Sequence, residues 1–405
     1  MILTNRINGM KKLHNPAFAE ALESNLRECI LPYWTEKMID PAGGFYGRRD
    51  GFDRLDADAP KGAILNARIL WTFAAAYNAL QTPEYLEIAS RAKDYILNYF
   101  IDIRYGGAFW SVNPDGSPAD TKKQFYAIAF IIYGLSEYYR ACGDEEALRV
   151  AMELFDCIEL HSRDREKGGY IEAATREWKP IADMRLSEKD SNASKTMNTH
   201  LHIIEGYTAL LRVTGDERVR EATVALLRIF LDRIVDHETG HLNLFFNDDW
   251  VREDDTCSYG HDIEASWLLV ETAEVIGDPQ LLEETLAVCR KVADAALEGL
   301  NSDGSLIYER HADGHMDREL HWWVQAENVV GQMYLAAWHG EPAGLDGAMR
   351  TFDYITRKLV DPDNGEWYWS RMPDGSINRR DDKAGFWKCP YHNGRACIEG
   401  LRLLS

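Results

Sequence analysis

The chain has 405 residues, of which 45% are apolar and 27% are charged, with only 13 prolines. This composition is typical of a globular protein and excludes a disordered or fibrous one. Acidic residues outnumber basic ones by 66 to 45, and the resulting formal charge of −21 excludes nucleic acid and anionic membrane surfaces as expected partners and favours a neutral or cationic small ligand.

The seven cysteines are an odd set without a C-x-x-C pair, which argues against a disulfide framework and a structural zinc site. The first residues contain no apolar segment of the length that a signal peptide needs. The longest apolar stretch, around residues 126–133, is less than half of the ~20 residues that span a membrane. We therefore expect a cytoplasmic protein that does not bind membranes.

Six segments combine a glycine with aromatic or apolar residues, and they begin at Gly43, Gly106, Gly168, Gly240, Gly304 and Gly365. They are 63, 62, 72, 64 and 61 residues apart. Two continue into FWSVNPDGS at 109–117 and YWSRMPDGS at 368–376, in which Pro-Asp-Gly predicts a tight turn between two extended arms. The spacing indicates six repeats of about 64 residues.

Stretches with an apolar period of 3.6 residues lie between the glycine segments. Residues 63–80 and 263–276 have this pattern and predict helices. Each repeat has room for two helices and a short hairpin, which gives about twelve helices. Six helix pairs can close into a ring without the polar end caps of an open array. We therefore expect an all-α (α/α)6 barrel, or toroid, that forms one catalytic domain over residues 1–405.

The longest interval contains a polar segment from Arg176 to Thr196. A loop of this length exceeds an ordinary connection. Such loops often form a rim or lid over a site, but a plain surface excursion is an equal alternative.

The chain lacks the dinucleotide, P-loop, hydrolase-elbow and zincin motifs, so any chemistry must come from dispersed side chains. Three histidines, His200, His261 and His392, stand at the predicted starts of three helices. In a closed ring such starts meet at one end, and a helix N-terminus favours a neutral imidazole that can act as a base. Glu264 shares a helix face with His261.

The remaining histidines are less suggestive. His202 lies two residues from His200 and points to another face. His241 and the others lie in polar or loop-like contexts and are expected to be exposed. A zinc site built from His200, His261, His392 and Glu264 fits the ligand types but has no supporting spacing, so we expect no metal.

Aromatic and charged residues complete the candidate site. Arg68 interrupts an otherwise apolar helix, and Trp322, Trp323 and Trp387 supply flat rings near Glu327. The 12 Trp and 19 Tyr exceed the needs of a core, and amphipathic rings commonly form platforms for sugars. An aromatic cavity with histidines, one cation and carboxylates suits a neutral sugar.

Four segments, MNTHLH at 197–202, YGHDIEASWLL at 259–269, WWVQAE at 322–327 and WKCPYHNGRAC at 387–397, resemble the cellobiose 2-epimerases of the N-acylglucosamine 2-epimerase superfamily. The resemblance runs from about Arg48 to the C-terminus. It implies an (α/α)6 barrel that inverts C2 of the reducing-end glucose of β-1,4-linked disaccharides without a cofactor, converting cellobiose to glucosyl-mannose.

The same resemblance implies site residues. His261 and His392 would be the acid/base pair and His200 a third site histidine, with sugar contacts from Arg68, Tyr126, Asn198, Glu264, Trp323 and Trp387. Trp322 and Glu327 are expected to bind substrate beside them. Cys389 departs from the pattern, where a smaller residue, usually glycine, is expected; this change should alter loop packing rather than chemistry.

The residues make physical sense of such a reaction. The C2 proton of an open-chain aldose is acidic only if the enediolate is stabilised, which Arg68 could do. Inversion then needs proton removal on one face and delivery on the other, a task for two groups that titrate near neutrality. We expect His261 and His392 on opposite faces of C2, with Glu264 orienting His261.

Four alternatives remain open at the level of the sequence. They are an aldose–ketose isomerase, an N-acylglucosamine 2-epimerase, an (α/α)6 glycoside hydrolase and a non-catalytic sugar-binding toroid. The hydrolase would use two carboxylates among Glu205, Glu264 and Glu327. In each case we expect a monomer that binds a small sugar, with a disaccharide as the first choice.

Overall fold

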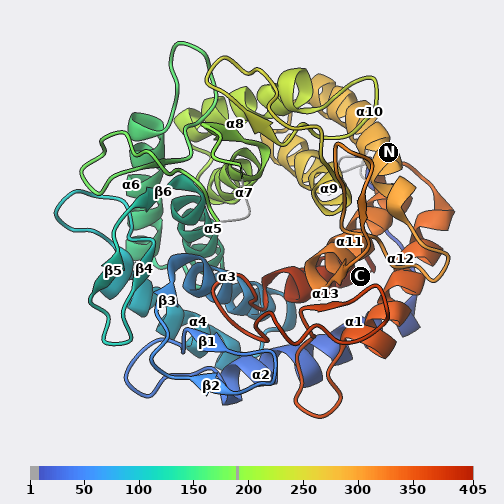
Figure 1. The fold of residues 1–405 in the computed structure, drawn as a ribbon, viewed down its shortest axis with the longest axis horizontal. Helices are drawn as coiled ribbons and strands as arrows, with labels where there is room; N and C mark the ends of the chain where they lie inside the picture. The colour runs from blue at the N-terminus through green and yellow to red at the C-terminus, as the bar shows by residue number, and fades with distance from the viewer. Residues whose placement is uncertain (1–8, 188–190, 405) are drawn as a thin grey trace, which may run out of the picture.

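The computed structural model describes residues 9–187 and 191–404. In this part of the chain the helices form two concentric rings (Figure 1). The inner ring consists of α3 (Ala63–Leu80), α5 (Phe125–Cys142), α7 (Met197–Thr214), α9 (Tyr259–Ile276), α11 (Trp322–Trp338) and α13 (Tyr391–Leu404). Each inner helix contacts the next and α13 contacts α3, so the ring is closed. The predicted (α/α)6 barrel is confirmed.

The outer ring begins with a continuous helical stretch made of α1 (Pro16–Ser24), η1 (Asn25–Ile30) and α2 (Leu31–Glu36). It continues through α4 (Pro83–Tyr95), α6 (Glu145–His161), α8 (Glu217–Ile229), α10 (Pro279–Ala296) and α12 (Pro342–Tyr354). Short π- or 3₁₀-helical turns extend four of these helices: η2 (Ile96–Phe100), η3 (Phe230–Ile234), η4 (Leu297–Gly299) and η5 (Ile355–Leu359).

Burial explains why the two rings differ in sequence. Residues 63–76 of α3 and 125–138 of α5 are all buried, because an inner helix is covered by an outer helix, by two inner neighbours and by the contents of the ring. Such a helix is apolar nearly all round, whereas an outer helix such as α8 buries one face only. The helix predicted over 63–80 is confirmed, and the one predicted from residue 263 begins earlier, at Tyr259.

Short antiparallel strands lie at the end of the barrel where the inner helices begin (Figure 1). A strand just before an inner helix pairs with the next hairpin: β3 (Lys61–Gly62) with β4 (Ser111–Val112), β6 (Lys123–Gln124) with β7 (Ala173–Ala174), β8 (Lys195–Thr196) with β9 (Phe245–Phe246), β10 (Cys257–Ser258) with β11 (Glu309–Arg310), and β13 (Leu320–His321) with β14 (Ser370–Arg371). The remaining strands are β1 (Arg48–Arg49) with β2 (Leu55–Asp56), β5 (Pro118–Asp120) beside β4, and β12 (Met316–Asp317) beside β11. A bridge between Arg49 and Ala384 joins the first and last repeats.

A buried ion pair recurs in this strand layer. A lysine two residues before an inner helix pairs with an aspartate of the preceding hairpin, at 2.6 Å in Lys61–Asp40, 2.9 Å in Lys123–Asp102 and 2.8 Å in Lys195–Asp164. The lysine side chains are at most 1% exposed. Because loss of one partner would leave a buried charge unpaired, these pairs fix the starts of α3, α5 and α7 relative to the outer ring.

The polar segment that begins at Arg176 packs over the start of α5. Arg176 binds Asp102 through two nitrogens, at 2.8 and 3.1 Å, and the Gln124 amide donates to the carbonyls of Met184 and Arg185 at 3.0 and 2.9 Å. Residues 188–190 of this segment lie outside the described residues. Across the ranges that the structure covers, no helix has both the length and the apolar character needed to cross a membrane.

Candidate active site

One layer of side chains meets at the centre of the ring. It is formed by the sixth residue of each of the first five inner helices and the fifth residue of α13, namely Arg68, Phe130, His202, Glu264, Glu327 and Arg395. Several of these residues touch one another: the Arg68 guanidinium lies 4.2 Å from the Phe130 ring centre, the Phe130 and His202 rings are 4.7 Å apart, and Arg395 bonds to both glutamates. The repeat thus builds a polar and aromatic layer.

Three buried carboxylates converge on Arg395. One guanidinium nitrogen lies 2.6 Å from Glu264 and 2.7 Å from Glu327, and another bonds to Glu205 and the Tyr391 hydroxyl. Burial opposes ionisation of Glu205, but Arg395 and His202 lower its pKa below the ordinary value. Burial and the neighbouring Glu327 raise the pKa of Glu264 to about 8. These surroundings favour the protonated form of Glu264.

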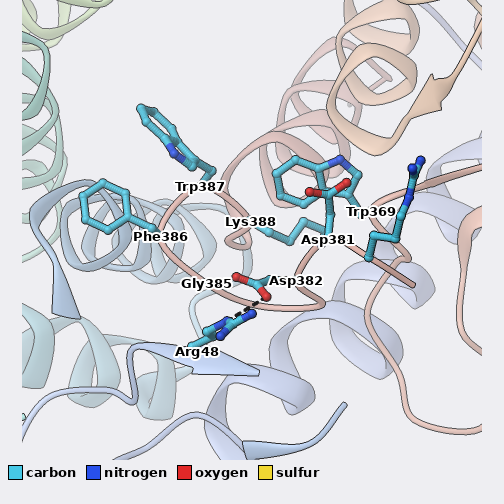
Figure 2. A pocket seen from close by; sticks show the side chains of 9 residues that line it. Arg48, Trp369, Asp381, Asp382, Gly385, Phe386, Trp387 and Lys388 are labelled. Carbon is cyan, nitrogen blue, oxygen red and sulfur yellow. Dashed lines mark hydrogen bonds and ion pairs between the residues drawn. The ribbon is translucent and has the colours of Figure 1, made fainter. Parts of the chain in front are cut away.

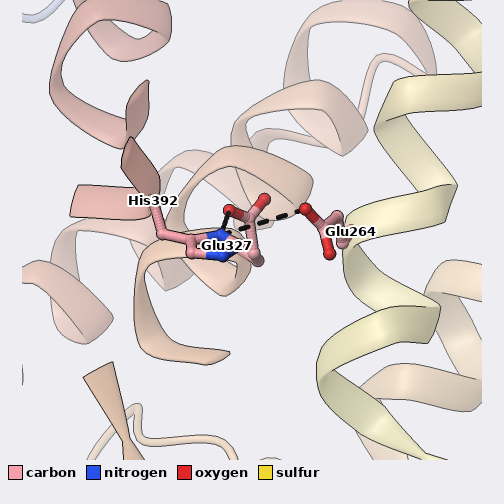
Figure 3. Close-up of side chains that lie close together, drawn as sticks. All are labelled: Glu264, Glu327 and His392. Atoms are coloured by element: carbon pink, nitrogen blue, oxygen red, sulfur yellow. Dashed lines mark hydrogen bonds and ion pairs between the residues drawn. The ribbon is translucent and has the colours of Figure 1, made fainter. Parts of the chain in front are cut away.

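His392 lies above this cluster on the first turn of α13. Its Nδ1 lies 2.7 Å from Glu327 and 3.9 Å from Glu264 (Figure 3). The second oxygen of Glu327 accepts a hydrogen bond from the Trp267 indole at 3.0 Å. Glu327 therefore fixes the proton of His392 on Nδ1 and leaves Nε2 as the basic nitrogen. Burial, together with the charges of Arg68 and Arg395, lowers the pKa of His392 well below its ordinary value.

His261 lies on the first turn of α9, in less charged surroundings. Its Nδ1 lies 2.8 Å from the Ser258 hydroxyl, and its ring centre is 4.8 Å from that of Trp323. The Trp323 ring is in turn 5.6 Å from His392, so it lies against both imidazoles. Burial, with a smaller effect of His202, lowers the pKa of His261 to about 3.

The expectation that Glu264 orients His261 is wrong. Glu264 is hydrogen-bonded to Arg395, and the residue that holds His261 is Ser258, three positions earlier. The reason is helical geometry: the sixth residue of α9 points to the centre of the ring, while His261 stands at its rim.

Arg68 faces the same space from α3. It donates to the Tyr126 hydroxyl at 2.9 Å and to the Trp387 carbonyl at 3.4 Å. Its Nε has no hydrogen-bond partner among the described residues. The buried Cys389 thiol lies 3.7 Å from the same Trp387 carbonyl, so this departure from the expected glycine lies beside a carbonyl that Arg68 also binds.

The structure does not bring His200 to this group. Its Nε2 accepts a hydrogen bond from the backbone of Tyr170 at 2.9 Å, and its Nδ1 lies 2.6 Å from the Thr196 carbonyl. Both ring nitrogens are used in fixing the hairpin before α7. His200 is the fourth residue of its helix, the position at which Asp262 and Gln325 bond to the corresponding hairpins.

The histidine of α7 that faces the centre is His202. Its Nδ1 lies 2.9 Å from Glu205, and its ring packs on Tyr126 at 4.8 Å. Sequence reasoning missed it because His200 was matched to His261 as a residue near a helix start. Alignment of the repeats by helix register would have placed His202 with Glu264 and Glu327.

The aromatic residues divide into two groups. Trp323 and Trp387 are half-buried, whereas Trp322 is buried and packs on Trp369, with ring centres 4.5 Å apart. Trp387 also lines a pocket of about 220 Å³ that Figure 2 shows. The other residues of this pocket are Arg48, Trp369, Arg380, Asp381, Asp382, Gly385, Phe386 and Lys388. The side-chain oxygen of Asn198 is buried and has no hydrogen-bond partner among the described residues.

The expectation that His241 is exposed is wrong. Its side chain is 5% exposed, and its Nδ1 lies 2.7 Å from Asp262, which follows His261 in the chain. The carboxylate partner explains the burial of His241. The local sequence does not reveal this partner, because 21 residues separate His241 from Asp262.

Glu264, Glu327 and His392 also have the composition of a metal site, since one ligand atom of each lies within 4.8 Å of the others. Figure 3 shows them together. However, the same oxygens of both glutamates already bind Arg395. A cation would have to compete with a guanidinium that already balances the carboxylate charge. We interpret the three residues as part of a hydrogen-bonded network.

The sequence as a whole matches the family model described as N-acylglucosamine 2-epimerase over residues 44–396. The chain belongs to this family. Within the N-acylglucosamine 2-epimerase family, it is 55% identical to the cellobiose 2-epimerase of Bacteroides fragilis, covering 94% of this chain and 98% of that one. A cellobiose 2-epimerase of Ruminococcus albus is 40% identical, covering 93% and 97%.

A solved structure supports the same assignment. The cellobiose 2-epimerase of Spirochaeta thermophila superimposes with a TM-score of 0.90 at 42% identity, covering 96% of each chain. A D-mannose isomerase structure, 20% identical with a TM-score of 0.83 and covering 96% of this chain and all of that one, shares the fold. The protein is therefore a carbohydrate epimerase, an enzyme of the isomerase class.

Proposed function

We propose that this epimerase inverts C2 of the reducing-end glucose of cellobiose and related β-1,4-linked disaccharides. The observation that carries the proposal is the pair His261 and His392. Each has its Nδ1 bonded to a protein group, by Ser258 and Glu327 respectively, and Trp323 lies between them. Burial lowers the pKa of both imidazoles and so favours the neutral form, which can accept a proton from the substrate through a ring nitrogen that no group of the described residues occupies.

The proton transfers follow from this geometry. One histidine, as a neutral imidazole, removes the C2 proton of the open-chain sugar, and the other, which enters the step with a proton on the nitrogen that faces C2, delivers that proton to the opposite face. The two histidines leave the step with their protonation states exchanged. The negative charge moves from C2 to the aldehyde oxygen, which gives an enediolate, so the substrate itself is the electron sink and no cofactor takes part. Arg68, with Tyr126 held against it, stabilises the enediolate oxygen.

The second sugar ring needs a place beside this centre. The pocket of Figure 2 begins at Trp387, whose carbonyl binds Arg68, and offers the rings of Trp369 and Phe386 together with the carboxylates of Asp381 and Asp382. Flat rings beside hydrogen-bond acceptors suit a glucosyl unit. Asn198 stays a proposed sugar contact, because its buried side-chain oxygen has no hydrogen-bond partner among the described residues.

The arrangement of carboxylates argues against a glycoside hydrolase. Such an enzyme places two carboxyl groups on either side of the glycosidic bond. Here Glu205, Glu264 and Glu327 all point at the one guanidinium of Arg395. An aldose–ketose isomerase would form the same enediolate, and the product distinguishes it from an epimerase.

The decisive test is incubation with cellobiose in deuterated water, followed by NMR of the products. Inversion at C2 with deuterium at that carbon and an intact glycosidic bond is expected. A ketose product would favour the isomerase, release of monosaccharides the hydrolase, and unchanged cellobiose a binding protein. The monomeric state, expected of the chain, would be tested by light scattering, and the cytoplasmic location by fractionation.

A further inference from the structure

Four of the hairpins before the inner helices share one backbone hydrogen bond, which identifies equivalent positions. The residue that opens the turn donates its N–H to a carbonyl five residues later, and in four repeats that carbonyl belongs to Gly107, Gly169, His241 or Glu366. Two repeats thus replace a glycine with a large polar residue. These are the repeats whose inner helices carry His261 and His392.

Glu366 occupies its position against a backbone preference. Its φ is +61°, in the left-handed region that Gly107 and Gly169 also occupy and that favours glycine. Strained residues persist where the surrounding structure fixes them, and they gather at functional sites. A side chain at this position therefore needs a compensating role.

The contacts of Glu366 show what that side chain does. One carboxylate oxygen accepts from Lys388 at 2.7 Å and from Asn393 at 2.6 Å, and the other accepts from the indole of Trp34 on α2 at 2.7 Å. All four residues are fully buried. Asn393 directly follows His392, so one carboxylate ties the first turn of α13 to the outer ring.

His241 makes the corresponding contact in the repeat that contains α9. Its Nδ1 lies 2.7 Å from one oxygen of Asp262, whose other oxygen accepts from the Leu242 backbone at 2.9 Å. Asp262 is fully buried and directly follows His261. In both repeats the hairpin side chain therefore holds the residue that comes immediately after a histidine of the proposed pair.

We propose that His241 and Glu366 are positioning residues, each of which orients one of the two proton-transferring histidines: His241 acts through Asp262 on His261, and Glu366 acts through Asn393 on His392. Neither touches the substrate. The proposal rests on the proposed function, because it assigns one hairpin to each face of C2.

Exchange of the C2 proton reports on each face separately. The equilibrium between the epimers fixes the ratio of forward and reverse kcat/KM, so a defect in one histidine lowers epimerisation equally in both directions. Deuterium uptake into recovered, uninverted sugar depends only on the histidine that deprotonates that epimer. The measurement is therefore made by NMR in deuterated water, starting once from cellobiose and once from glucosyl-mannose.

Glu366→Gln is expected to slow uptake into one epimer by about tenfold while leaving uptake into the other nearly unchanged, because small misplacements of a catalytic group are costly. His241→Gln is expected to show the same bias with the epimers exchanged. Asp102→Asn is the matched control: it removes the partner of the buried Lys123 in a repeat that carries neither histidine. It should lower Tm without changing the ratio of the two uptake rates.

Equal losses of uptake in both epimers, or the same bias in both variants, would overturn the proposal. If the glutamine variants do not fold, Asn393→Ser and Asp262→Ser remove the helix side of each contact and must show the same opposite biases. Absence of C2 exchange in the unaltered enzyme would refute the proposed function instead, so the two failures are distinguishable.

Discussion

His392 and His261 stand at the starts of two inner helices, yet their supports differ. His392 is bonded to the carboxylate of Glu327, which is itself held by Arg395 and Trp267. His261 is bonded to the hydroxyl of Ser258 and otherwise meets the ring of Trp323. A carboxylate partner fixes the tautomer and stabilises the imidazolium form, whereas a hydroxyl can donate or accept and does neither strongly.

The difference shows that a symmetric reaction does not require symmetric machinery. Inverting C2 needs one proton acceptor and one proton donor, whose roles exchange with the direction of reaction. The network of Arg395 and its three glutamates is hydrogen-bonded to His392 through Glu327, whereas the hydrogen bond of His261 goes to Ser258. We therefore expect the two sides to respond unequally to loss of their supports, although both histidines are required.

The largest expected effect comes from removal of either imidazole. His261→Asn and His392→Asn should each lower epimerisation of cellobiose by about 10³-fold, because proton transfer on one face then lacks its group. Product formation followed by chromatography measures this. Retention of more than a tenth of the activity in either variant would contradict the assignment of that histidine, and the two histidines could then no longer be compared as a catalytic pair.

The second prediction concerns the supports themselves. Glu327→Gln should lower kcat by about 10- to 100-fold, because it removes the charge behind His392. Ser258→Ala should lower kcat only about threefold, since one neutral hydrogen bond is lost. Steady-state kinetics with cellobiose separates the two. Equal effects would show that the two histidines are supported alike, whatever their partners.

The third prediction separates the two aromatic contacts. Trp387→Ala should raise KM by about tenfold, since this ring lines a pocket whose lining includes neither histidine of the pair. Trp323→Ala should act mainly on kcat, because the ring lies against both imidazoles. Phe386→Ala removes another aromatic ring from the same pocket and serves as the control for loss of a pocket ring in general. A change in kcat alone for Trp387→Ala would indicate that Trp387 contributes to the chemical step rather than to binding.

Much of the architecture could be predicted from the sequence, because it depends on local and periodic features. Glycine spacing indicated six repeats, and the apolar period located the helix from Ala63 to Leu80. The convergence of helix starts predicted that His261 and His392 lie close together, and in the structure both lie against the Trp323 ring. These inferences needed no information about contacts between distant residues.

The polar network could not be predicted, because its partners are far apart in the chain. Arg395 meets Glu205 across 190 positions, and no local pattern marks a cation that three carboxylates share. His200 and His202 differ for another reason: the fourth residue of an inner helix faces its hairpin and the sixth faces the centre of the ring, and only alignment of the repeats by helix register shows this. The pairing of His241 with Asp262 likewise depends on the hairpin.

The smallest expected effect is a dependence of stability on pH. The pKa of His261, lowered to about 3, means that the unfolded chain binds a proton more readily below pH 6.5, so this group reduces stability as the pH falls. The pKa of Glu264, raised to about 8, has the opposite sign: the folded chain holds the proton, so stability falls as the pH rises from about 4.5 to 8.

Glu264→Gln should therefore gain a few degrees in Tm relative to the unaltered protein between pH 5 and pH 8, as measured by calorimetry. Glu205→Gln alters another carboxylate on Arg395, but the pKa of Glu205 is lowered, so its Tm difference should stay constant over that range. A constant difference for Glu264→Gln as well would mean that Glu264 is ionised. Arg395 would then balance two charged glutamates beside His392, and the two histidines would differ more than we infer. A pH-dependent difference would instead leave Glu327 as the charged partner of His392, which is the asymmetry that the geometry predicts.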